Sequence, residues 1–141
     1  VYDTMWNATR KMAEGIAEGI KSADKGVTVK LFNAANSDKN DVITEIFKSK
    51  AILVGSSTVN KSIMHGTAGI LGMIVGLGLK NKKAAAFGSY GWSGESVDII
   101  TEILKDAKFE IVNHGIKELW NPDEEAMNRC IQFGRDFASK L

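Results

Sequence analysis

Three short segments carry the residues best suited to bind a small anionic ligand. The first has two threonines and opens directly into an amphipathic helix, because apolar residues recur at helical spacing after Thr9. Backbone N–H groups at a helix N-terminus attract phosphate, and hydroxyl groups add further donors. We therefore expect this segment to bind a phosphate group, with the hydroxyl groups of Thr4 and Thr9 closing around it. An N-cap followed by a tight turn is the alternative interpretation.

The other two segments each follow a short, unbroken apolar run. The second is polar and comprises Ser57, Thr58, Val59 and Asn60; the third is aromatic and rich in glycine, and comprises Ser89, Tyr90, Gly91, Trp92, Ser93 and Gly94. An exposed tryptophan can cover a planar ring, and glycines let the backbone approach the ring edge. Alternatively, the two aromatic side chains pack only on a neighbouring loop.

A phosphate site beside an aromatic wall describes a mononucleotide with a flat ring. FMN is expected rather than ATP, because the three segments offer no carboxylates for Mg²⁺. The sequence also lacks the phosphate-binding motif G-x-x-x-x-G-K-[ST] and the dinucleotide-binding motif G-x-G-x-x-G. An NTPase and a dinucleotide-binding protein are therefore disfavoured.

Length and composition restrict the class of protein further. The chain has 141 residues, a net charge of +1 and a single cysteine, Cys130, which fits one compact domain without an internal disulfide. The low net charge predicts no strong nucleic-acid binding, and two histidines with one cysteine are too few for a structural zinc site. No apolar run approaches the length of about 20 residues that a membrane span needs. We expect a cytoplasmic protein with no metal site and no membrane span.

The elements that must position the three segments alternate between strand and helix. Strands are expected over the start of the chain to Tyr2 and over residues 27–31, 51–55, 84–88 and 109–112. Helices are expected over residues 9–22, after a cap at Ser37 or Asp38, within 62–79, around 97–104 and after Pro122. This alternation predicts right-handed crossovers and a parallel sheet. We expect an α/β fold, a flavodoxin-like three-layer sandwich with a five-stranded parallel sheet of order 2-1-3-4-5.

Residues 62–79 are unusual because they contain five glycines and no charged side chain. A helix at the surface of a protein normally displays a polar face. One interpretation is a helix packed closely on the sheet, with Gly69, Gly72 and Gly76 permitting the approach. The other is that a partner domain or a second chain covers its outer face.

The sequence resembles the flavodoxin domain of A-type flavoproteins, which are the flavodiiron proteins, including flavorubredoxin. The resemblance rests on residues 1–9, 54–60 and 86–94 in this order, and it extends over essentially the whole chain. It implies an electron-transfer domain that binds FMN through the three segments. The phosphate loop of the family falls on Thr4, Met5, Trp6, Asn7, Ala8 and Thr9, and the two flavin loops fall on Ser57, Thr58, Val59 and Asn60 and on Ser89, Tyr90, Gly91, Trp92, Ser93 and Gly94. Because the flavin ring carries the chemistry, no catalytic residue is expected in the chain itself.

The resemblance also implies partners for the chain. The electrons would pass to a diiron centre that reduces nitric oxide or oxygen and lies in a separate metallo-β-lactamase-like domain. With only His65 and His114 and no H-x-H-x-D motif, this chain cannot hold that centre. We therefore expect residues 1–141 to be a single FMN-binding domain excised from a longer chain. Rubredoxin or a flavin reductase is the implied electron donor, and a homodimer is the implied assembly.

Two positions depart from the pattern of the family, and other functions stay open. Relatives often have Pro where Ser57 stands, and a second Gly where Ser93 or Glu95 stands. The alternative function is a stand-alone flavodoxin-like electron carrier or an FMN-dependent quinone or NAD(P)H reductase, so the chain's own enzymatic role is open. A receiver domain is disfavoured because Gly55-Ser56, not a phosphoacceptor Asp, ends the third expected strand. A domain that keeps only the fold and contacts a partner is the last alternative.

Overall fold

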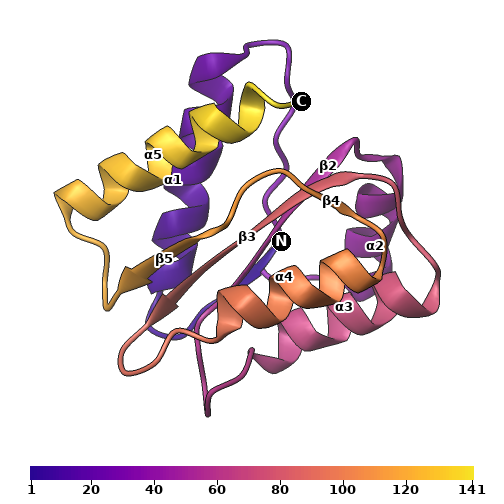
Figure 1. The fold of residues 1–141 in the computed structure, drawn as a ribbon, viewed down its shortest axis with the longest axis horizontal. Coiled ribbons are helices and arrows are strands. Elements are labelled where there is room, and N and C mark those ends of the chain that lie inside the picture. Colours follow the sequence, from indigo (N-terminus) through magenta and orange to yellow (C-terminus); the bar gives the residue numbers. More distant parts are fainter.

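The computed structural model describes all 141 residues and shows a twisted sheet between two layers of helices (Figure 1). The strands are β1 (Tyr2–Asp3), β2 (Ala51–Ser56), β3 (Lys83–Tyr90), β4 (Glu110–Ile111) and β5 (Ile116–Leu119). Strands β1 to β4 are neighbours in this order, β5 also pairs with β3, and every pairing is parallel. The expected α/β fold with a five-stranded parallel sheet is confirmed.

The helices are α1 (Ala8–Ala23), α2 (Lys39–Lys48), α3 (His65–Gly76), α4 (Ser96–Asp106) and α5 (Glu124–Ala138). Helices α1 and α5 lie side by side on one face of the sheet, and α2, α3 and α4 cover the other face (Figure 1). The carboxylate of Asp38 accepts the N–H groups of Asn40 and Asp41, which confirms the expected cap of α2. Helix α5 begins after its N-cap Asp123, so Pro122 precedes the cap instead of lying in the first turn.

Residues 27–31 do not form the expected strand. Strand β1 is only two residues long, and it meets this part of the chain at one point. Tyr2 donates its N–H to the Phe32 carbonyl at 2.9 Å, and the Tyr2 carbonyl accepts the N–H of Ala34 at 2.7 Å. A strand needs a partner for the N–H and C=O groups along its length, but Val27 donates its N–H back to the Asp24 carbonyl and residues 28–31 make no backbone hydrogen bond. The segment still runs toward the free side of β1, where the expected strand order places it.

The last expected strand, over residues 109–112, is divided in two. Strand β4 pairs with the first residues of β3, where Lys83 is level with Glu110. Strand β5 pairs with the last residues of β3, where Tyr90 is level with Leu119. The chain between them leaves the sheet, so β3 has two successive partners on this side. The second of these, β5, was missed by the sequence prediction.

Glycines have different roles in the α1–α5 pair and in α3. A Cβ atom at Gly19 of α1 would overlap the carbonyl of Ile131 in α5, and one at Gly134 of α5 would overlap a carbonyl of α1. No larger residue fits at either position. In α3, by contrast, nothing lies within 4 Å of a Cβ placed at Gly72 or Gly76. The prediction that these two glycines permit close packing of α3 is therefore wrong; the close approach is made by α1 and α5.

The outer face of α3 is apolar and uncovered in this chain. Val75 and Leu77 at its C-terminal end are exposed, whereas Ile70, Leu71 and Ile74 on the inner face are buried against the sheet. None of the helices combines the length and hydrophobicity that crossing a membrane requires.

Cys130 is a residue of α5, and its side chain packs in the core between α5 and α1. Its side chain is buried, and burial raises the pKa of the thiol to about 12. A thiol with that pKa is almost entirely protonated at neutral pH. Its predicted role as a small core residue is confirmed.

Candidate functional site

The three predicted segments come together beyond the carboxyl ends of β1, β2 and β3 (Figure 1). Parallel pairing places Asp3 level with Ser56 and Gly55 level with Phe87, so the segments that follow these strands begin side by side. We name residues 4–7 loop 1, residues 57–64 loop 2 and residues 91–95 loop 3. The other predicted residues flank these loops. Ala8 and Thr9 form the first turn of α1, and Ser89 and Tyr90 end β3.

Loop 1 presents backbone donors without acceptors. The N–H groups of Trp6, Asn7, Ala8 and Thr9 donate to no group of the protein. Trp6 and Asn7 have φ angles of 57° and 62°, and this left-handed turn leads the chain into α1 with no side-chain cap. The residue before the helix, Asn7, thus makes no side-chain cap, and the only hydroxyl acceptor near the first turn is Thr4 Oγ1, 3.4 Å from the Arg10 nitrogen. Free N–H groups at the positive end of a helix dipole suit a phosphate group.

Three hydroxyl groups join the bases of the loops, and we name them the hydroxyl cluster. Thr9 Oγ1 lies 2.9 Å from Ser57 Oγ and 2.8 Å from Ser89 Oγ, and the two serine oxygens are 3.1 Å apart. All three side chains are buried. Ser57 Oγ also accepts the N–H of Met5 at 3.0 Å. Three O–H groups are thus available as donors for the three hydrogen bonds of the cluster. The Thr9 hydroxyl bonds within the cluster and is not directed toward a ligand.

Thr4 has the only hydroxyl side chain of loop 1, and it is less buried than Thr9. Thr4 is half-buried, and its Oγ1 accepts a long hydrogen bond of 3.4 Å from the N–H of Arg10. Its O–H proton is bonded to no other group of the protein. Among the predicted hydroxyl groups of the first segment, Thr4 is thus the one with a free donor.

The base of loop 2 is fixed to its neighbours. Thr58 donates its N–H to the Ser89 carbonyl at 2.9 Å and its hydroxyl to Ser96 Oγ at 2.9 Å. Ser96 in turn donates its N–H to Thr58 Oγ1 at 3.3 Å. The side chain of Thr58 therefore faces the start of α4, where it links loop 2 to loop 3.

The tip of loop 2 is a tight two-residue turn. Val59 and Ser62 exchange N–H to carbonyl hydrogen bonds of 3.0 and 2.9 Å. Between them, Asn60 and Lys61 have φ angles of 50° and 57°, and both are exposed. Positive φ at both central residues is the signature of a type I′ turn, in which glycine or asparagine is usual. Nothing in the local sequence except Asn60 indicated this turn.

The two aromatic side chains of the third segment differ. A Cβ atom at Gly94 would lie 3.3 Å from Tyr90 Cδ1, so the Tyr90 ring packs against its own loop. Trp92 is 96% exposed, and its indole is free for contact with a ligand. The alternative in which both rings pack on a neighbouring loop is wrong for Trp92.

Trp120 also lies beside loop 3, and it was not among the predicted site residues. Trp120 directly follows β5, and it contacts Gly91 with its indole ring. Strand β5 is fixed to α5 because the buried carboxylate of Glu118 accepts hydrogen bonds of 2.9 and 2.7 Å from Arg129. The hydrogen bonds from the guanidinium to this carboxylate raise the pKa of Arg129, so the guanidinium stays charged. The signal that could have revealed Trp120 is the run of residues 116–119, which a strand prediction would have placed in the sheet.

The residues present fit FMN, which combines a phosphate, a planar ring and a ring N–H donor. The free N–H groups of loop 1 match the phosphate, and the exposed indole of Trp92 matches the ring. In loop 3, one carboxylate oxygen of Glu95 is buried without a hydrogen-bond partner, so an acceptor is available there. When bound, FMN supplies the capacity to take up and release electrons, and the chain's residues bind and orient it.

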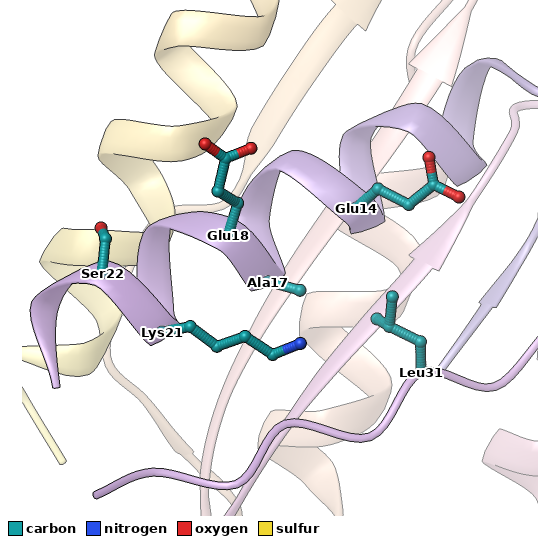
Figure 2. Close-up of a pocket in the computed structure, with 6 residues that line it drawn as sticks. All are labelled: Glu14, Ala17, Glu18, Lys21, Ser22 and Leu31. Carbon is teal, nitrogen blue, oxygen red and sulfur yellow. The ribbon is translucent and has the colours of Figure 1, made fainter. Parts of the chain in front are cut away.

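A surface groove of about 520 Å³ lies away from the three loops. It runs between α1 and the segment at residues 27–31, and Figure 2 shows Lys21 extending across it toward Leu31. Glu18 and Ser22 point to the opposite side of the helix in the same view. The groove contains no buried polar group. We assign no role to it. Its lining residues are Glu14, Ala17, Glu18, Lys21, Ser22 and Leu31.

Comparison with known proteins shows the family of the chain. The flavodoxin family model matches residues 1–134. The chain is 50% identical over 137 residues to the anaerobic nitric oxide reductase flavorubredoxin of Klebsiella pneumoniae, covering 97% of this chain and 28% of that protein. The chain thus spans a little over a quarter of the length of this curated relative.

Solved structures show the same fold. Rubredoxin oxygen:oxidoreductase from Desulfovibrio gigas superimposes with a TM-score of 0.92 at 34% identity, covering 99% of this chain and 34% of that one. A flavodoxin from the domain Archaea superimposes with a TM-score of 0.85 at 30% identity, covering 99% of this chain and 94% of that one. These matches confirm the expected resemblance to the flavodoxin domain of flavodiiron proteins and FMN as the cofactor. The chain belongs to the flavodoxin family.

Proposed function

We propose that this chain binds FMN through loops 1, 2 and 3 and relays electrons through it to a diiron centre in another domain. The observation that carries the proposal is that two unpartnered features follow strands at the same edge of the sheet, the free N–H groups at the start of α1 and the exposed indole of Trp92. The first suits the phosphate and the second suits the flavin ring. The chain's own residues bind, orient and partly shield the cofactor, and no acid, base or nucleophile is required.

The electron acceptor is inferred from the relatives. The Klebsiella relative is named as a nitric oxide reductase, and the Desulfovibrio protein as an oxygen oxidoreductase that uses rubredoxin. Because this chain spans 28% and 34% of those proteins, the terminal reaction belongs to the remainder of a longer protein of that type. We propose a metallo-β-lactamase-like diiron domain as the acceptor, rubredoxin or a flavin reductase as the donor, and a cytoplasmic homodimer as the assembly.

The first experiment is a titration of the purified apoprotein with FMN and with riboflavin, followed by quenching of flavin fluorescence. Riboflavin lacks the phosphate but keeps the ring. We expect FMN to bind about 100-fold more tightly than riboflavin, a difference of about 2.7 kcal/mol. Equal affinities would show that loop 1 is only a helix start, and absence of binding by both would refute the proposal.

A stand-alone electron carrier is a second candidate function. It is favoured by the archaeal flavodoxin, which this chain covers over 94% of its length. The two functions differ in the preferred acceptor. Under anaerobic conditions, the reduced FMN-loaded chain is mixed with a flavodiiron protein that lacks its flavin domain, and flavin reoxidation is followed by stopped flow. A rate that rises in proportion to the diiron protein supports the relay. A rate that does not respond to it favours the stand-alone carrier.

A further inference from the structure

Trp120 contacts loop 3 at Gly91, in the half of the loop (residues 91–93) whose backbone makes no hydrogen bonds with the protein. A Cβ atom added to Gly91 would lie 3.1 Å from Cζ3 and 3.2 Å from Cη2 of Trp120, so the indole is in close contact with the Gly91 backbone. Trp120 also donates its N–H to the Tyr90 carbonyl at 2.7 Å. The backbone groups of Gly91, Trp92 and Ser93 make no hydrogen bonds with the protein. Packing against Trp120 is therefore what restrains this half of the loop.

The backbone conformation of Trp120 is unusual. Its φ angle is 56°, a left-handed conformation that is rare and unfavourable for a bulky residue. The side chain is 66% exposed, so burial of the indole does not compensate for this conformation. Backbone strain of this kind persists where the surrounding structure requires it, and it is concentrated at ligand-binding sites.

We propose that Trp120 is a positioning residue for the flavin ring, which acts by holding Gly91 and thereby placing Trp92. This inference rests on the FMN site of the proposed function. The opposite half of loop 3 is already fixed, because Tyr90 packs on Gly94 and Ser96 bonds to Thr58. Trp120 completes the support from the side of β5.

The test is Trp120→Ala, with Trp120→Phe as the variant that keeps an aromatic ring and Leu119→Ala as the matched control. Leu119 is the preceding residue, and it is 53% exposed. We expect the dissociation constants of FMN and riboflavin to rise by the same factor, up to about fivefold, in Trp120→Ala, because the largest loss is that of the Trp92 contact itself. Trp120→Phe should restore most of the affinity, and Leu119→Ala should leave it within about twofold. An equal loss for both ligands locates the effect at the ring, because the FMN to riboflavin ratio reports on the phosphate.

A second variant tests the contact itself. Gly91→Ala adds a methyl group that must displace Trp120, so it should weaken FMN binding in the native background. In the Trp120→Ala background the same change should have almost no effect, because the space is open. Additive effects of the two changes would overturn the proposal, since a shared contact requires coupling.

A third readout does not depend on the cofactor. In the apoprotein, the NMR order parameters of the backbone N–H groups of residues 91–93 should be lower in Trp120→Ala than in Leu119→Ala, because the loop loses its contact with the indole. Unchanged order parameters together with unchanged ligand affinity would refute the role of Trp120. If the native chain binds no FMN, the proposed function fails. Order parameters that are also unchanged in Trp120→Ala then refute the positioning role, and lower order parameters leave Trp120 as the support of loop 3 alone.

Discussion

The bases and the tips of the three loops are built in opposite ways. At the bases, Thr9, Ser57 and Ser89 are buried and bond to one another, and Thr58 bonds to Ser96. At the tips of loops 1 and 3, a tryptophan ring is exposed and backbone N–H groups have no protein acceptor, whereas the tip of loop 2 is closed by the bonds between Val59 and Ser62. The polar groups that fix the loops are thus separate from the polar groups that are free for a ligand.

This difference predicts how substitutions in the two regions should act. Removing one hydroxyl from a buried, fully bonded set leaves its partners unsatisfied in the core, and this lowers the free energy of unfolding. An exposed tip residue has no such partners, so its loss should change ligand binding alone. The predictions below test this separation, beginning with the largest effect.

Thr9→Val removes two hydrogen bonds of the hydroxyl cluster and keeps the shape of the side chain. We expect the free energy of unfolding of the apoprotein to fall by about 2 kcal/mol, because one buried hydroxyl donor loses its acceptor. FMN affinity should fall as well, since the bases of all three loops depend on the cluster. Urea denaturation and FMN titration measure the two effects.

Thr9→Ser is the control, because it keeps the hydroxyl group and removes only a methyl. It should retain most of the stability that Thr9→Val loses. An unfolding midpoint for Thr9→Val equal to that of the native chain would show that the cluster does not stabilise the loop bases.

Trp92→Ala should act on binding without acting on stability. The side chain is 96% exposed, so the free energy of unfolding of the apoprotein should change by less than about 0.5 kcal/mol. Loss of an aromatic contact with the flavin ring should weaken FMN and riboflavin equally, by about 1 kcal/mol or fivefold. Trp92→Phe should restore part of this affinity. A large change in the urea midpoint would contradict the separation of tips from bases.

Lys61→Gly should give the smallest effect, and one of opposite sign. Lys61 has a φ angle of 57° in the turn of loop 2, a conformation that favours glycine. We expect the free energy of unfolding to rise by about 0.5 kcal/mol, because relief of strain slightly exceeds the greater freedom of glycine in the unfolded chain. Ser62→Gly is the control, since Ser62 is in the same turn without positive φ, and it should lose stability. A loss for Lys61→Gly as well would indicate that the tip is not strained.

Much of the fold could be predicted because its signals are local. The apolar runs at residues 51–55 and 84–88 lie within β2 and β3, and helical periodicity located all five helices to within a few residues. Strand and helix alternation then fixed a parallel sheet, and a parallel sheet placed the three polar segments at one edge. The segment at residues 27–31 has the alternation of a strand, but a strand also needs a hydrogen-bonding neighbour, and periodicity does not report on neighbours.

The site residues were predicted by type, but not by role. Thr9 and Thr58 look alike in the sequence as hydroxyl donors for a ligand, yet the structure bonds both to other parts of the protein. The partners of Thr9 are 48 and 80 residues away along the chain, and no local pattern contains that information. Trp120 was missed for the same reason, since its contact with Gly91 exists only because β5 pairs with β3.

The sequence by itself determined the alternation of strands and helices, the resemblance to flavin-binding domains and the three segments that meet at one edge of the sheet. These follow from side-chain periodicity and residue type, which act over a few neighbouring residues. Only the tertiary structure decided which hydroxyl groups face one another, which glycines allow helices to touch, and which tryptophans remain free. Those features depend on packing between distant residues, where shifts of a few ångströms decide whether a polar group bonds to the protein or stays available to a ligand.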